Sequence, residues 1–193
     1  MNIILASTSP YRRRLLERLQ LPFRCVSPET DETPLPDEAP AALAVRLARA
    51  KAESIARLQP GALIIGSDQV ASIEGSIMGK PGNFNSASAQ LRSSSGREVV
   101  FYTAIALIAP NRDQERFHVE RFCVRFRALS DSQIANYLHR EQPYDCAGSF
   151  KVEGLGIALF ESLIGDDPTS LVGLPLIKLT ALLGELGVDI LHA

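Results

Sequence analysis

The sequence lacks several features that would place it in a well-defined class of protein. Its three cysteines, Cys25, Cys123 and Cys146, are widely spaced and form no CxxC pair, so neither a disulfide framework nor a zinc knuckle is predicted. No apolar run approaches the roughly 20 residues that span a bilayer. The basic run 12–14 follows the apolar N-terminus, whereas a signal peptide has the reverse order. We therefore expect a cytoplasmic protein that does not enter a membrane.

Positive charge is not in surplus either. Twenty lysines and arginines against 22 acidic residues give a net charge of -2, which argues against a protein that coats a nucleic acid polymer. A few local cations would still suffice to bind a small anion. With 46% hydrophobic and 22% charged residues, the 193-residue chain has the composition of one ordinary globular domain, which excludes wholesale disorder.

Apolar runs alternate with helical patterns along the chain and predict an α/β fold. Strands are expected at 2–6, 23–26, 63–66, 99–109, 117–127 and 154–160. Helices are expected to begin at Ser9-Pro10, Pro40, Ser86, Ser130 and Pro175. A polar turn at 111–114 separates the two longest strands, so we expect a mixed rather than a purely parallel sheet.

The first candidate site joins a predicted strand to the start of a helix. Residues 6–13 read ASTSPYRR, in which Ser9 is a helix N-cap and Pro10 a first-turn proline. The helix dipole makes Arg12 and Arg13 unfavourable there unless an anion is bound, and guanidinium groups bind phosphate bidentately. A phosphate site and a capped helix with a solvated basic face are equally consistent with this motif.

Lys51 and Asp68 are the next candidates. Lys51 repeats at intervals of four with Leu47 and Ile55 and so lies on the apolar stripe of the helix that follows Pro40, where an ammonium group is unfavourable unless it is paired. Asp68 follows the apolar run 63–66, at the expected carboxyl end of a buried strand, where ligands of α/β sheets gather. A carboxylate there can bind a divalent cation or accept a proton from water. The alternatives are a snorkelling lysine and a turn aspartate.

Three weaker signals occur elsewhere in the sequence. Lys80 lies between a glycine and a proline, which fixes its direction, although no P-loop motif is present. Glu32 belongs to an acidic, proline-rich loop and gains weight only if it meets a metal. Residues 146–156 are small and glycine-rich, allowing close backbone approach, and Glu153 is their one acid.

Seven segments of the chain together resemble the Maf family of nucleotide pyrophosphatases. They occur in the family's order and spacing: LASTSPYRR (5–13), DE (31–32), LARAKA (47–52), IIGSDQV (64–70), GKP (79–81), CAGSF-EG-G (146–156) and VGLP (172–175). The resemblance implies a Maf-like (ITPase-like) two-lobed α/β fold, with a central mixed sheet flanked by helices and a cleft between the lobes. Residues 1–193 would form a single domain whose two lobes share one core, and the protein would be a homodimer.

The resemblance also implies a reaction and a set of residues that carry it. Nucleoside triphosphates would be hydrolysed to monophosphate and pyrophosphate with Mg²⁺ or Mn²⁺. Asp68 would be the general base and a metal ligand, with Glu32 as its partner at the metal. The other implied residues are Lys51 and Lys80 in catalysis and Ser7, Arg12 and Arg13 in binding the triphosphate, with Arg12 the stronger match of the two arginines.

Three departures from the commonest family pattern point to the branch that hydrolyses 7-methyl-GTP and so removes a modified nucleotide. They are Tyr11, where arginine is frequent, Gln69, where threonine is common, and Glu153, where glutamine is common. Methylation at N7 makes guanine cationic, and an aromatic face attracts a desolvated cation by about 1–2 kcal/mol. A carboxylate can accept from guanine N1–H and the 2-amino group together. A dTTP- or UTP-type pyrophosphatase and a nucleotide-binding regulator of septum formation remain the alternatives.

Overall fold

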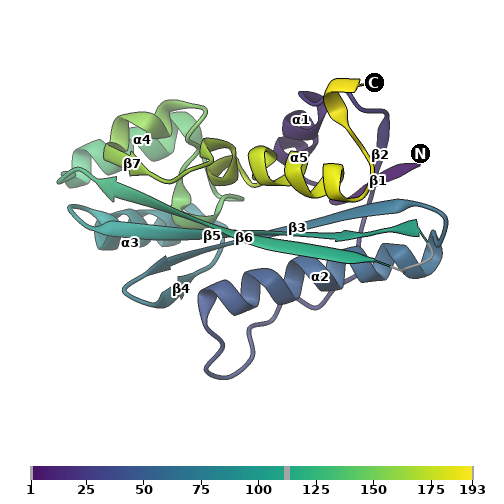
Figure 1. Ribbon diagram of the computed structural model, residues 1–193. Coiled ribbons are helices and arrows are strands. Elements are labelled where there is room, and N and C mark those ends of the chain that lie inside the picture. The colour runs from purple at the N-terminus through teal and green to yellow at the C-terminus, as the bar shows by residue number, and fades with distance from the viewer. Residues whose placement is uncertain (1, 111–113, 193) are drawn as a thin grey trace. The chain divides into compact units, whose positions relative to one another are not determined.

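The computed structural model describes residues 2–110 and 114–192, and Figure 1 shows how its elements are arranged. The strands are β1 (Ile3–Ala6), β2 (Phe23–Val26), β3 (Leu63–Ile73), β4 (Ser76–Met78), β5 (Glu98–Ile108), β6 (Glu115–Phe126) and β7 (Phe160–Ile164). The α-helices are α1 (Pro10–Glu17), α2 (Pro40–Leu58), α3 (Phe84–Ser94), α4 (Asp131–Glu141) and α5 (Leu176–Glu185). The strands form one sheet in the order β2-β1-β3-β5-β6-β7, with β4 paired to β3. The predicted mixed α/β fold is confirmed.

The chain folds into two compact units. The first comprises Met1–Gln69, Thr103–Glu120 and Asp167–Ala193, and the second comprises Val70–Tyr102 and Arg121–Asp166. The long strands β3, β5 and β6 have residues in both units. Three of the four crossings between the units fall inside these strands, and the fourth lies between β7 and residue 168.

In the first unit, the sheet separates α2 from α1 and α5, which lie on its other face (Figure 1). β1 pairs in parallel with both β2 and β3, so that Ala6 lies opposite Gly66. The face toward α1 and α5 carries a buried cluster that includes Leu5, Ile65 and Leu179. On the other face, a Cβ atom at Gly66 would collide with the Ala48 carbonyl oxygen and would lie 2.8 Å from Ala52 N. Glycine at this position therefore lets α2 pack directly against β3.

The second unit is built around an aromatic cluster. Phe150 makes edge-to-face contacts with Phe101, Phe126 and Phe160, whose ring centroids lie 4.7–5.8 Å away. Such pairs contribute beyond the area they bury. The capping box predicted at Ser130 is present, with Ser130 and Gln133 bonding each other's backbone at the start of α4. Within the described ranges of the chain, no helix combines the length and apolarity needed to cross a bilayer.

Two local predictions differ from the structure, and a third falls largely on residues that the structure does not describe. The strand expected at 63–66 continues to Ile73: its pairing with β1 ends at Gly66, but β5 lies on its other side and β4 pairs with residues 71–73. The strand expected at 154–160 is instead a 3₁₀ helix, Leu155–Leu159, and β7 starts at Phe160, where pairing with β6 begins. The turn predicted at 111–114 falls largely on residues 111–113, which lie outside the described part of the chain.

Candidate active site

Lys51 forms the centre of a charged cluster in the first unit. Its Nζ lies 2.6 Å from Asp68 Oδ1 and 2.5 Å from Glu32 Oε1. The side chains of Lys51 and Asp68 are only 8% and 9% exposed, whereas that of Glu32 is 54% exposed. Lys51 is on the buried stripe of α2, as predicted, and its partners come from β3 and from the loop before α2. One lysine thus balances a buried and a half-exposed carboxylate.

Asp68 is inside β3 rather than at its end, because β3 continues to Ile73 beside β5. The parallel pairing with β1 nevertheless ends two residues earlier, at Gly66 opposite Ala6. Ser7, the residue after β1, is buried, and its Oγ accepts a hydrogen bond from Ser9 N at 3.1 Å. The expectation that Asp68 would follow the carboxyl end of its own strand is therefore wrong, because β3 continues to Ile73.

The start of α1 holds the predicted arginines in two different environments. Ser9 caps the helix by accepting from Arg12 N at 3.4 Å. The Nε of Arg12 donates to the Gly173 carbonyl oxygen at 2.8 Å. Burial lowers the pKa of the Arg12 guanidinium, and the negative charges of Asp68 and Glu32 raise it again. Arg13 is exposed and pairs with Glu17 at 3.0 Å. Of the two arginines, Arg12 is the one that interacts electrostatically with the carboxylates of the charged cluster.

The segment from Asp167 to Gly173 accepts hydrogen bonds from side chains of three other elements of the first unit. It contains the 3₁₀ helix η4 (Pro168–Val172). The Gly173 carbonyl oxygen accepts from Ser67 Oγ at 3.0 Å as well as from Arg12. The Ser170 carbonyl oxygen accepts from Gln69 Nε2 at 2.8 Å and from Thr103 Oγ1 at 2.9 Å. We refer to residues 167–173 as the η4 clip, because it ties α1, β3 and β5 together.

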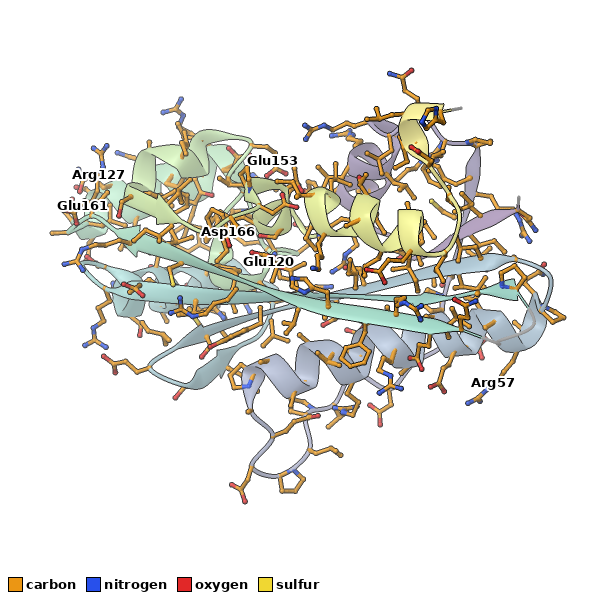
Figure 2. All side chains as sticks on the ribbon, viewed as in Figure 1. Arg57, Glu120, Arg127, Glu153, Glu161 and Asp166 are labelled. Carbon is orange, nitrogen blue, oxygen red and sulfur yellow. The ribbon has the colours of Figure 1, made fainter. Side chains whose placement is uncertain are left out.

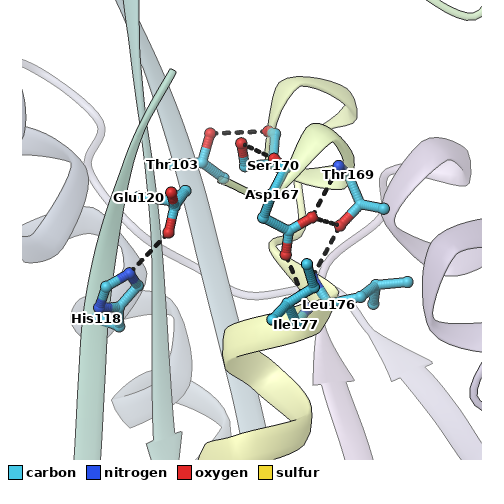
Figure 3. Close-up of polar contacts among 8 residues, drawn as sticks. All are labelled: Thr103, His118, Glu120, Asp167, Thr169, Ser170, Leu176 and Ile177. Carbon is cyan, nitrogen blue, oxygen red and sulfur yellow. Dashed lines mark hydrogen bonds and ion pairs between the residues drawn. The ribbon is translucent and has the colours of Figure 1, made fainter. Parts of the chain in front are cut away.

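Asp167 fixes the η4 clip, as the close-up in Figure 3 shows. Its Oδ1 accepts from Thr169 N at 2.9 Å and from Thr169 Oγ1 at 2.6 Å, while Oδ2 accepts from Ile177 N at 2.7 Å. Asp167 is 2% exposed, and its carboxylate accepts hydrogen bonds from the backbone of both η4 and the first turn of α5. The residue types around this aspartate indicate only a turn. Asp two residues before Thr169 and next to a proline matches an Asx turn, and this spacing could have signalled the capping role.

Several residues that form or contact the η4 clip were not predicted from the sequence. Thr103 and Ser170 are fully buried and bonded to each other through the Ser170 carbonyl oxygen. Thr103 lies inside an apolar strand and belongs to no recognisable motif. The only signal was a hydroxyl group in a buried strand, since such a group needs a hydrogen-bond partner. Gly173 belongs to the VGLP segment (172–175), but the use of its carbonyl oxygen as an acceptor for Arg12 cannot be read from residue types. These contacts depend on long-range folding.

The second unit contains two of the predicted residues, Lys80 and Glu153. Lys80 is exposed and lies between β4 and α3, where Gln90 Nε2 donates to the Gly79 carbonyl oxygen at 2.9 Å and Gly82 N donates to that of Tyr144 at 2.9 Å. Glu153 is exposed, as Figure 2 shows. Its backbone belongs to a glycine-containing turn between η2 (Ala147–Ser149) and η3 (Leu155–Leu159). Tyr11, in the first unit, is half-buried in the first turn of α1.

The family profile and the similar sequences agree on one family. The profile described as Maf-like protein matches residues 2–186. The chain is 53% identical to the 7-methyl-GTP pyrophosphatase of Colwellia psychrerythraea over 98% of its own length and 94% of that protein. It is 54% identical to the protein of that name from Bordetella avium over 99% of its own length and 96% of that one. The match to the solved Staphylococcus aureus Ham1 protein covers 65% of this chain and 72% of that one, with 14% identity and a TM-score of 0.48.

Proposed function

The chain belongs to the Maf family, and from this premise we propose that it hydrolyses 7-methyl-GTP to 7-methyl-GMP and pyrophosphate. The observation that carries the reaction class is the cluster in which Lys51 bridges Asp68 and Glu32 next to the start of α1. In phosphoryl transfer, ammonium and guanidinium groups stabilise charge on phosphate oxygens, and a carboxylate can accept a proton from the nucleophile.

In the proposed reaction, Asp68 accepts a proton from a water molecule that attacks the α-phosphorus in line. A bond forms between the water oxygen and the α-phosphorus, the bond from that phosphorus to the bridging oxygen breaks, and pyrophosphate leaves with the electron pair. Lys51 and Lys80 neutralise the negative charge on the phosphate oxygens. Ser7, Arg12 and Arg13 bind the triphosphate at the start of α1, where backbone N–H groups favour anions.

A divalent cation fits the chemistry of this cluster. Asp68 and Glu32 supply hard carboxylate oxygens, which are the donors that Mg²⁺ and Mn²⁺ prefer. In the described parts of the chain, no three His, Cys, Asp or Glu residues group as ligands for a metal ion. Asp68 and Glu32 would therefore hold the ion together with phosphate oxygens and water, as is usual for Mg²⁺. The ion would supply charge neutralisation at the phosphates.

The base specificity is assigned to Tyr11, Gln69 and Glu153. Tyr11 would stack on the cationic 7-methylguanine ring, and Glu153 would accept from its N1–H and 2-amino groups. Gln69 donates its amide to Thr103 and to the carbonyl oxygens of η4, so its effect would pass through the position of the η4 clip. Homodimeric assembly, the choice between Mg²⁺ and Mn²⁺ and a cytoplasmic location remain predictions.

A substrate panel tests this function. The purified protein is incubated with Mg²⁺ and, separately, 7-methyl-GTP, GTP, UTP, dTTP, CTP and ITP, and the released pyrophosphate and monophosphate are quantified. We expect the highest kcat/KM for 7-methyl-GTP. A preference for UTP or dTTP would keep the reaction and overturn the assigned specificity. Binding of nucleotides without turnover of any would overturn the enzymatic function and favour a regulator.

A further inference from the structure

The turn that carries Glu153 is tightly closed on itself. In the 151–156 turn (residues 151 to 156), the Lys151 carbonyl oxygen accepts from Gly154 N at 3.2 Å and from Gly156 N at 3.1 Å. A Cβ atom at Gly156 would collide with the same carbonyl oxygen. Glycine at this position is therefore required by the close approach of the two backbones. Glu153 is at the middle of this turn and is exposed.

Both ends of the 151–156 turn are held by one face of α4. The hydroxyl oxygen of Tyr137 accepts from Lys151 N at 3.1 Å, and Glu141 Oε2 accepts from Leu155 N at 2.8 Å. Tyr137 and Glu141 are four residues apart on the helix and so lie on the same face. The ring of Tyr137 is buried, with the residue 4% exposed. Burial raises the pKa of the Tyr137 hydroxyl, which keeps it neutral.

A charged interaction between Lys151 and Glu141 also holds the 151–156 turn against α4. Lys151 Nζ donates to the Glu141 carbonyl oxygen at 3.1 Å, at the C-terminal end of α4, and lies 4.0 Å from Glu141 Oε1. A cation at this end of a helix interacts favourably with the helix dipole. Gly154 lies against the same carboxylate, where a Cβ atom would be 2.8 Å from Glu141 Oε2. The Glu141 side chain thus touches the residues on both sides of Glu153.

We propose that Tyr137 and Glu141 are positioning residues that set the preference for the methylated base by fixing the backbone on which Glu153 is mounted. The inference rests on the proposed function, in which Glu153 reads the base. A carboxylate discriminates between bases only when its position is restricted, since a mobile side chain must be ordered again on each binding event. Tyr137 and Glu141 hold the turn without themselves contacting the substrate.

The test compares kcat/KM for 7-methyl-GTP with kcat/KM for GTP in Tyr137→Phe, Glu141→Gln and Glu141→Ala. Tyr137→Phe keeps the buried ring and removes the acceptor for Lys151 N. Glu141→Gln keeps an acceptor for Leu155 N and loses the charge that faces Lys151, so it should rescue part of the defect of Glu141→Ala. We expect the ratio of the two kcat/KM values to fall about fivefold or more in Tyr137→Phe and Glu141→Ala, the factor for loss of one hydrogen bond. The matched control is Arg140→Ala, an exposed position on the same helix.

A second readout separates this role from a general loss of stability. Hydrogen exchange of peptides that cover residues 151–156 should accelerate in Tyr137→Phe and Glu141→Ala and should not in Arg140→Ala. If the two substrates lose activity equally, or if the ratio stays as in the wild-type protein, the positioning role is overturned. If the wild-type protein itself shows no preference for 7-methyl-GTP, the proposed function fails instead, and the two failures are distinguishable.

Discussion

The buried ion pair between Lys51 and Asp68 makes a sharp prediction about stability. Lys51→Met replaces the ammonium with an apolar side chain of similar length, on a helix stripe that already carries Leu47 and Ile55. The new side chain fits the stripe, and what is lost is the partner of Asp68, whose side chain is 9% exposed. An uncompensated buried charge destabilises a protein strongly. Glu32 contributes less because it is half-exposed and water can solvate it.

The expected magnitudes follow from this geometry. Breaking a buried pair costs about 3–5 kcal/mol, and we expect about 3 kcal/mol for Lys51→Met because the site is partly open. For a chain of this size, that corresponds to a fall of about 6–12 °C in Tm. Asp68→Asn should cost about 1 kcal/mol, since the lysine keeps Glu32 as a partner. The double variant should be more stable than Lys51→Met alone, because the amide at position 68 no longer buries a charge.

Urea denaturation followed by circular dichroism measures all three variants. Lys178→Met, at an exposed position on α5, is the matched control and should change stability by no more than about 0.5 kcal/mol. If the double variant is less stable than Lys51→Met by the full cost of Asp68→Asn, the two side chains are not coupled. That result would refute the argument that the lysine compensates the aspartate.

Three further predictions follow from the same structure. Gly66→Ala should destabilise the protein by about 1–3 kcal/mol and reduce its activity, because the new Cβ atom would push α2, which carries Lys51, away from β3. The control in the same denaturation series is Gly61→Ala, since a Cβ atom at Gly61 would have open space around it. The Arg46 contact lowers the pKa of Glu38 from 4.5 to about 2, so this pair stabilises the fold above pH 4.5 and the contribution disappears as the pH falls through about 2. Glu38→Gln should therefore flatten the acid limb of stability against pH, and an unchanged limb would contradict the assignment. Tyr11→Ala should reduce kcat/KM for 7-methyl-GTP about fivefold or more relative to GTP, because only the methylated ring is cationic; equal losses on the two substrates would argue against stacking.

Local signals in the sequence were sufficient for most of the fold. Ser9-Pro10 marks the start of α1, the Ser130–Gln133 capping box marks that of α4, and β2 spans the predicted residues 23–26. The two failures have different causes. The end of β3 pairs with β4 across the short connection Glu74-Gly75, so this missed extension was partly a local signal. The start of β7 depends on its register with β6, a strand more than 30 residues earlier, and such a pairing cannot be read from a short window.

The candidate site divides in the same way. The apolar stripe of α2 identified Lys51 as a buried cation in need of a partner, and the structure supplies Asp68 and Glu32. The η4 clip could not be predicted, because its contacts join a carbonyl oxygen at Gly173 to side chains that are 106 and 161 residues away in the chain. Backbone acceptors leave no mark in the residue types around them. Motifs therefore identify charged groups better than they identify the hydrogen bonds that hold them.

The central claim is that Asp68 activates water for attack on the α-phosphorus, and hydrolysis in ¹⁸O-labelled water tests it most directly. Wild-type protein and Asp68→Asn are each incubated with 7-methyl-GTP and Mg²⁺, and the products are analysed by mass spectrometry. We predict that the label enters 7-methyl-GMP and not pyrophosphate, and that Asp68→Asn loses at least about 100-fold in kcat, the range for a general base. Label in pyrophosphate, or a near-normal rate in Asp68→Asn, would contradict the account.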